Sequence, residues 1–93
     1  MTDKEIREAI GDPALYEGLA EEAVELAHAA LKFARILRGE NPTPADRWKT
    51  KWSLIDEYSD LRIYSDILDL RIDAQVYSDK KERMVARIRE SKR

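Results

Sequence analysis

The sequence predicts an all-α protein built on a long helical hairpin and completed by oligomerisation. Gly occurs only at 11, 18 and 39 and Pro only at 13, 42 and 44, so helix-breaking residues gather near the start and in one short loop. Between these points, apolar residues recur at spacings of three and four, the period of an amphipathic helix. We expect residues 1–93 to form a single domain. A helical chain this short often completes its core with further copies, so we expect a homo-oligomer, either a dimer or a tetramer.

The first long helix should begin at Asp12, whose side chain can cap it, with Pro13 in the first turn. It should run to about Arg38, because Gly39 follows directly and glycine is typical just past a helix end. Residues 1–10 could form a short leading helix.

A loop with the sequence NPTPAD follows at 41–46, in which Thr43 or Asp46 can cap a second long helix. An unbroken helix from 45 to 92 would be roughly 70 Å long at 1.5 Å per residue, so we expect a bend between Leu70 and Tyr77. A third helix is then expected from about Ala74 to Glu90.

Two long helices joined by a short loop should lie antiparallel with their apolar stripes facing each other. The stripe expected on the first helix consists of Leu19, Ala23, Leu26 and Ala30. That on the second helix consists of Leu54, Leu61, Tyr64 and Leu68. Glu22 falls at the edge of the first stripe, whereas Glu57 falls inside the second with Asp60 on its shoulder. An unpaired buried charge costs several kcal/mol, so Glu57 needs a cation, a proton or a hydrogen-bond network.

Two pairs of carboxylates therefore face each other across the predicted hairpin. Glu22 and Glu25 are three residues apart on one helix, and Glu57 and Asp60 are three apart on the other, so each pair shares a helix face. Four such carboxylates repel one another, and a divalent cation is their natural counter-charge. Oxygen ligands favour Mg²⁺ or Mn²⁺ over zinc.

Composition excludes several classes of function. The chain has no cysteine, which rules out disulfides, thiolate nucleophiles and zinc–cysteine sites. Its 17 Lys and Arg nearly balance 19 Asp and Glu, and a net charge of −2 gives no field for holding a nucleic-acid backbone. The N-terminal stretch MTDKEIREAIGD is charged where a signal peptide is apolar, and no 18 apolar residues run together. We expect a cytoplasmic protein without a membrane segment.

The two carboxylate pairs resemble a known motif. EAVE at 22–25 followed by EYSD at 57–60 is similar to the ExxE and ExxD pair of the MazG-like all-α nucleoside triphosphate pyrophosphohydrolases, a superfamily that includes dimeric dUTPases and dCTP pyrophosphatases. LAEEAVELAHAALKFARILRGENPTP resembles the small phage and bacterial members associated with dATP/dGTP pyrophosphohydrolysis, in which a long helix ends in an NPTP loop. The resemblance covers roughly residues 15–90.

This resemblance implies Mg²⁺-dependent hydrolysis of a nucleoside triphosphate between its α and β phosphates, giving the monophosphate and pyrophosphate. The expected substrates are purine dNTPs such as dATP and dGTP, with dUTP or dCTP as alternatives. The expected metal ligands are Glu22, Glu25, Glu57 and Asp60. Glu21 or Glu22 would take a proton from the attacking water.

Several cations and one amide are candidates for binding the substrate. Lys32 lies seven residues after Glu25 on the same helix face and could reach a phosphate. Lys80 and Arg83 could close over the triphosphate from the third helix, as a resemblance to a KxxR pattern suggests, or they could belong to a solvated helix end. Asn41 could bind a base edge or cap the loop.

The remaining candidates favour structural interpretations. The aromatic side chains at 33, 48, 52 and 64 could stack on a base, but aromatics at helical spacing more often belong to a core or an interface. His28 is expected on the solvated surface. A non-catalytic helical module that binds nucleotide or protein is the alternative to the enzyme, and release of pyrophosphate from dNTPs with Mg²⁺ would separate the two.

Overall fold

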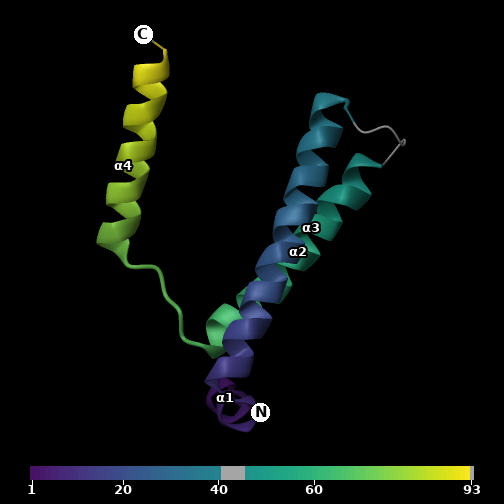
Figure 1. Cartoon of the computed structure of the whole chain (residues 1–93), viewed down its shortest axis with the longest axis vertical. Helices are drawn as coiled ribbons and strands as arrows, with labels where there is room; N and C mark the ends of the chain where they lie inside the picture. The colour runs from purple at the N-terminus through teal and green to yellow at the C-terminus, as the bar shows by residue number, and fades with distance from the viewer. Residues whose placement is uncertain (41–45, 93) are drawn as a thin grey trace.

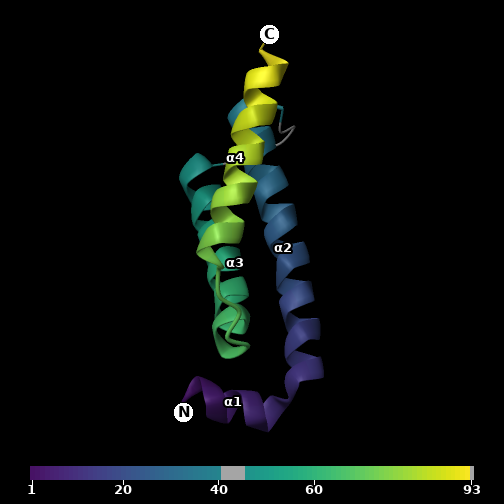
Figure 2. The ribbon, with the colours of Figure 1, turned by 90° about the vertical axis from the view of Figure 1, so that its left-hand side faces the viewer.

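The computed structural model describes residues 1–40 and 46–92, which form four helices and no strand. The helices are α1 (Asp3–Ile10), α2 (Asp12–Arg38), α3 (Arg47–Ile67) and α4 (Ala74–Ser91). α2 and α3 lie side by side as an antiparallel hairpin, α1 packs across the end where α2 begins and α3 finishes, and α4 stands apart from all three (Figures 1 and 2). The predicted all-α class is confirmed.

The bounds of α2 agree with the sequence, but its N-terminal cap differs from the prediction. Gly11 is the N-cap and makes no side-chain hydrogen bond, while Asp12 is already helical. The Asp12 carboxylate is occupied elsewhere, because it accepts two hydrogen bonds from the Arg7 guanidinium at 2.8 and 3.0 Å. At the other end, Gly39 adopts the left-handed φ of 72° that ends the helix, as glycine can without strain.

Aspartates cap the two later helices. Asp46 accepts hydrogen bonds from the backbone N–H groups of Trp48 and Lys49, at 2.8 and 3.2 Å, and so starts α3 as predicted. The other predicted cap, Thr43, lies outside the described residues. Asp73 accepts from the backbone N–H of Val76 at 2.9 Å and starts α4.

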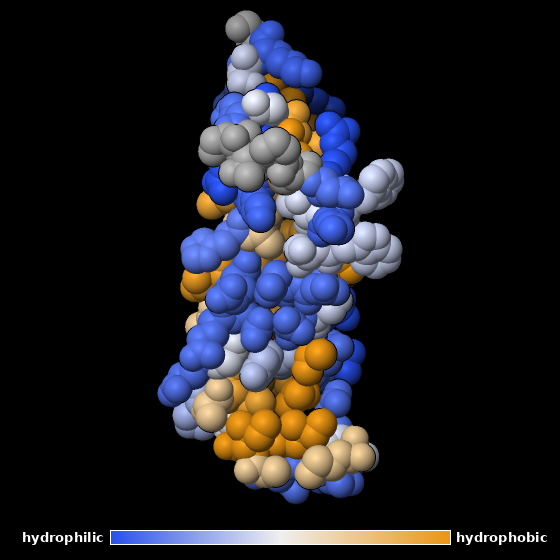
Figure 3. Space-filling model, turned by 90° about the vertical axis from the view of Figure 1, so that its right-hand side faces the viewer, coloured by the Kyte–Doolittle hydropathy of each residue, from blue (hydrophilic) through white to orange (hydrophobic). Residues whose placement is uncertain are grey.

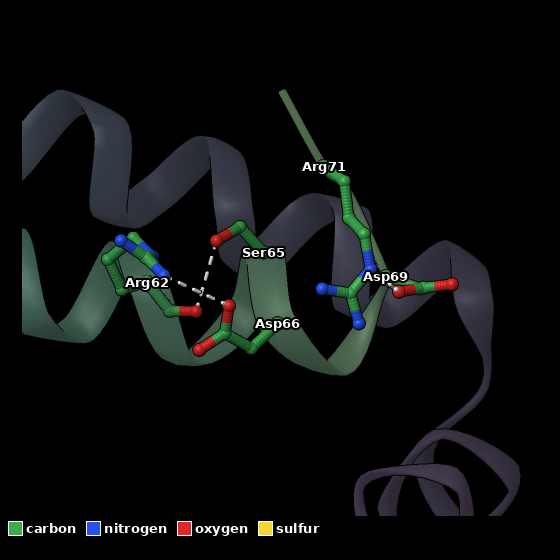
Figure 4. A network of polar contacts seen from close by, with 5 residues as sticks. All are labelled: Arg62, Ser65, Asp66, Asp69 and Arg71. Carbon is green, nitrogen blue, oxygen red and sulfur yellow. Dashed lines mark hydrogen bonds and ion pairs between the residues drawn. The ribbon is translucent and has the colours of Figure 1, made fainter. Parts of the chain in front are cut away.

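The bend expected between 70 and 77 is a non-helical segment at 68–73. Asp69 turns the chain there with φ of 54°, and its carboxylate accepts from Arg71 Nε at 2.7 Å. One turn earlier, Arg62 pairs with Asp66 at 3.5 Å (Figure 4). These contacts are local, so the segment leaves the hairpin without tying α4 back to it.

The hairpin interface follows a heptad pattern on both helices, with the less exposed residues alternating in steps of four and three. On α2 these residues are Leu15, Leu19, Glu22, Leu26, Ala29, Phe33 and Ile36. On α3 they are Thr50, Leu54, Glu57, Leu61 and Tyr64, followed by Leu68 at its C-cap. The predicted stripe of α3 is thus confirmed.

The stripe predicted for α2 is wrong in part. Ala23 and Ala30 are exposed, and Glu22 lies in the buried stripe rather than at its edge. The physical reason is that α2 is apolar around much of its circumference, so two stripes compete to face α3. The stripe that carries Leu15 and Phe33 removes more apolar surface from water than the one built of alanines, and it faces α3.

Tight packing is concentrated at the end of the hairpin near α1. Leu15, Ile67 and Leu68 form a buried cluster there, with Tyr64 packed against it, and we call this region the apolar end. A Cβ at Gly18 would lie 2.6 Å from Cζ of Tyr64, so the glycine lets that ring lie directly on α2.

Arg7 joins three helices at the apolar end. Besides its two bonds to Asp12 on α2, it donates from Nη1 to the carbonyl oxygen of Leu68 at the end of α3, at 3.2 Å. A cation is favourable at that position, because the last carbonyls of a helix carry partial negative charge. No helix in the described part of the chain is long and apolar enough to cross a membrane. A cytoplasmic location stays a prediction.

Candidate metal centre

Three carboxylates meet at the middle of the hairpin. Glu22 on α2 and Glu57 and Asp60 on α3 each offer an oxygen, and these oxygens lie within 4.8 Å of one another. Glu22 and Glu57 reach this point because both occupy the buried stripe, whereas Asp60 is exposed and joins from its shoulder. We call Glu22, Glu57 and Asp60 the carboxylate triad.

The triad is short of positive charge. The described residues form ion pairs between Arg7 and Asp12, Arg62 and Asp66, and Arg71 and Asp69, and none of these involves the triad. Burial raises the pKa of the Glu22 carboxyl above its usual value, and the negative charges of Asp60 and Glu57, followed by those of Glu25 and Glu21, raise this pKa further. The cluster therefore carries electrostatic repulsion that a cation would relieve.

The donor set fits a hard divalent cation. All three side chains offer carboxylate oxygens, which Mg²⁺ and Mn²⁺ prefer, and no sulfur or imidazole ligand of residues 1–40 or 46–92 joins them. An exposed shoulder at Asp60 leaves access from solvent, so a cation held here could keep water or ligand oxygens in its coordination sphere.

Glu25 and Glu21 stand beside the triad without joining it. Both are exposed on α2, and both are near enough for their charge to act on Glu22. The structure thus brings together three of the four predicted metal ligands and places Glu25 at their margin. Glu21, one of the two predicted proton acceptors, lies on the solvated face of α2.

A hollow of about 290 Å³ extends from Glu57 toward the loop of the hairpin. It is lined by the predicted phosphate ligand Lys32 on α2 and by Lys49 on α3, which the sequence analysis missed. Thr50 and Ser53 line its α3 side, together with Asp46 at the start of that helix. The hollow is therefore lined by two carboxylates, of Glu57 and Asp46, and by two ammonium groups.

The other predicted binding residues lie away from the triad. Lys80 and Arg83 are on α4, next to each other on its surface with Arg87, and α4 contacts neither helix of the hairpin in its own chain. Asn41 lies outside the described residues. His28 is exposed, as predicted.

The aromatic residues divide between the hairpin and the solvent. Phe33 is half-buried and Lys51 Nζ lies 5.2 Å from its ring centroid. Trp48 and Trp52 are 73% and 62% exposed, on the side of α3 opposite to the hairpin interface. They therefore take no part in the hairpin core.

Comparison with known proteins adds no relative: no family model, no curated protein and no solved structure matches this chain.

Proposed function

We propose that this protein hydrolyses nucleoside triphosphates to the monophosphate and pyrophosphate with the help of Mg²⁺. The single observation that carries the proposal is the carboxylate triad on facing positions of two packed helices. Two of its members occupy stripe positions where apolar side chains would pack better, and no cation of the described residues pairs with them. The motif resemblance of 22–25 and 57–60 supports the same reaction.

The triad suits this chemistry because phosphoryl transfer depends on positioning and neutralisation of charge more than on a covalent nucleophile. Mg²⁺ would supply neutralisation of the phosphate oxygens and a lowered pKa for water, and Mn²⁺ could replace it. Glu22, Glu57 and Asp60 would hold the ion, with Glu25 at the margin completing the set. A carboxylate of Glu21 or Glu22 would accept the proton of the attacking water.

The hollow beside Glu57 is the proposed site for the phosphate chain. Lys32 and Lys49 line it and carry the charge that phosphate oxygens need. Asn41 is proposed as a further substrate ligand, whereas Lys80 and Arg83 lie on α4, which does not contact the hairpin in its own chain. The preferred substrates are proposed to be dATP and dGTP, and the working form a dimer or a tetramer.

The test is release of pyrophosphate from dATP, dGTP, dCTP and dUTP with Mg²⁺, repeated with EDTA. We expect release from at least one purine nucleotide, and its loss on chelation. A folded protein that releases nothing from any of the four would contradict the proposal and favour a non-catalytic module. The metal itself is tested separately: because Mg²⁺ would bind the folded chain and not the unfolded one, a concentration ten times its Kd should stabilise the fold by about 1.4 kcal/mol.

A further inference from the structure

The chain exposes far more surface than a compact protein of its mass. Its accessible surface is 7780 Å², against about 5,500 Å² expected for a folded monomer of 10.8 kDa. Its radius of gyration is 17.3 Å, against about 12 Å for a compact chain of this length. The excess of about 2,200 Å² lies within the range that obligate homodimers bury per chain.

One part of this excess is an apolar stripe on α4. Tyr77, Met84, Val85 and Ile88 recur on one side of this helix, and three of them are exposed by 48% or more. Lys81 lies on the same side, with its Nζ 5.9 Å from the Tyr77 ring centroid. Lys80, Arg83 and Arg87 flank the stripe on one side. α4 packs against no other described helix, so no described part of its own chain covers the stripe (Figure 1).

A second part is the side of α2 that does not face α3. We call this the outer face of α2, made of Ala20, Ala23, Val24, Ala27, Ala30 and Leu31, all of them exposed. Its alanines are small enough for another helix to approach closely, and larger side chains can fit between them. The acidic residues Glu17 and Glu21 border it. Seen from another side, a hydrophobic patch also lies open below a hydrophilic band, at the α1 end (Figure 3).

We infer that the α4 stripe packs on the outer face of α2 of a second copy of this chain. The two surfaces are complementary in side-chain size, because the large side chains of the α4 stripe would pack against the alanines of α2. Charge matches at the N-terminal half of the outer face, where the cations beside the stripe meet Glu17 and Glu21 of the other copy. In a twofold dimer the α4 stripe of each copy packs on the outer face of α2 of the other copy. The same contact then occurs twice, both surfaces are covered in both copies, and the assembly is closed.

The exposed tryptophans of α3 are a poorer partner for α4. Trp48 and Trp52 lie among Arg47, Lys49 and Lys51, which would repel the basic flank of α4. A lipid surface could accept the α4 stripe but would leave the outer face of α2 uncovered. A second copy covers both, and the inference is independent of the reaction proposed above.

The first test is the mass in solution by light scattering at micromolar concentration, with helix content followed by circular dichroism. The wild-type chain should scatter as a multiple of 10.8 kDa. Ile88→Asp on α4 and Ala27→Asp on α2 should each reduce the mass to a single chain. The matched controls Ala86→Asp and His28→Asp place the same charge on the exposed polar sides of the same helices and should leave the mass unchanged.

The second test uses the absence of native cysteine. A chain carrying only Met84→Cys is mixed with a longer, tagged chain carrying only Ala20→Cys, Ala27→Cys or Ala34→Cys, so that three positions along α2 are sampled. Oxidation should link the two chain types to each other for at least one position. Because these substitutions are mild, this measurement stands even where an aspartate variant fails to fold.

Three results would overturn the inference. A wild-type chain that scatters as a monomer would exclude the second copy. Loss of mass in Trp52→Asp but not in Ala27→Asp would move the contact to α3. A chain carrying Met84→Cys and Ala27→Cys together that links only within itself would show that α4 folds back on its own hairpin.

Discussion

The apolar end and the carboxylate triad occupy the same pair of helices and the same kind of position in their heptad pattern, yet they contain opposite chemistry. At the apolar end, Leu15 of α2 is fully buried and packs with Ile67 and Leu68. Two turns along α2 from Leu15, Glu22 takes a stripe position, and Glu57 takes one on α3. Leucine would stabilise the fold better at both positions.

The apolar end stabilises the hairpin, whereas the triad in its middle is the proposed binding site for the metal. One end supplies apolar burial and a three-helix contact through Arg7, and the middle carries charges that repel each other. Substitutions in the two regions should therefore act in opposite ways, on stability in one and on metal-dependent activity in the other.

The largest effect is expected from Leu15→Ala. This side chain has no exposed surface, so truncation loses its burial and leaves a cavity beside Ile67 and Leu68. The fold should lose about 2–5 kcal/mol, measured by urea unfolding. Ile10→Ala, at a residue that is 53% exposed, is the control and should change stability little. Equal losses in the two variants would mean that the apolar end is not the main packing site.

Glu57→Gln should lower activity and leave stability unchanged or higher. It keeps the size of the side chain and removes its charge, so the proposed hydrolysis should fall at least about 100-fold, the scale of losing one preorganised electrostatic group. Without metal, the variant should melt no lower than the wild type, because repulsion within the triad is relieved.

Glu8→Gln, on the exposed surface of α1, is the control for Glu57→Gln and should retain activity. An active Glu57→Gln with a lowered melting temperature would show a paired structural carboxylate instead, and would refute the metal assignment.

A smaller effect is expected at Gly18, and its sign depends on Tyr64. Gly18→Ala adds a Cβ 2.9 Å from the Tyr64 hydroxyl oxygen, and the overpacking should exceed the helix propensity that alanine gains, for a net loss of about 1 kcal/mol. In a Tyr64→Leu background the ring is gone, so the same substitution should stabilise the fold. Thermal unfolding of the four chains of this cycle measures the reversal, and an unchanged sign would rule out the contact.

The smallest effect is a pair of opposite pH dependences in the metal-free protein. Because the pKa of Glu22 is raised in the folded state, folding is disfavoured above that pKa, and this cost should disappear as the pH falls toward the ordinary value of 4.5. Because the hydrogen bond from Arg7 lowers the pKa of Asp12, its stabilising contribution is present above the ordinary value of 3.8 and is lost as the pH falls below it.

Glu22→Gln should remove the first pH dependence and Asp12→Asn the second. Melting temperatures between pH 7 and pH 2.5 provide the measurement. Identical pH profiles for wild type and either variant would contradict the corresponding assignment.

The sequence predicted the helices well because their ends are marked by residues with one local role. Gly39 adopts the positive φ that ends α2, and Asp46 caps α3 through its own carboxylate. Asp12 misled the prediction because its carboxylate is taken by Arg7, a contact between helices that no local pattern reveals. Glu22 was predicted at the edge of the buried stripe rather than within it for a related reason. Alanines make α2 apolar on two sides, and only packing against α3 decides which side is buried.

The candidate site was predictable to the same extent. Glu57 stood out because its own helix has one clear stripe, and Asp60 followed from its spacing. Lys49 was missed because it belongs to neither stripe and gains its place beside Lys32 only when the loop folds the hairpin back.

The contact of Arg7 with the Leu68 carbonyl also fixes an order of events during synthesis. Asp12 is translated five residues after Arg7, so that ion pair can form as soon as both have left the ribosome. Leu68 follows 61 residues later, and at 5–20 residues per second it is made at least about three seconds after Arg7. The contact of α1 with the end of α3 can therefore form only after most of the chain has been made.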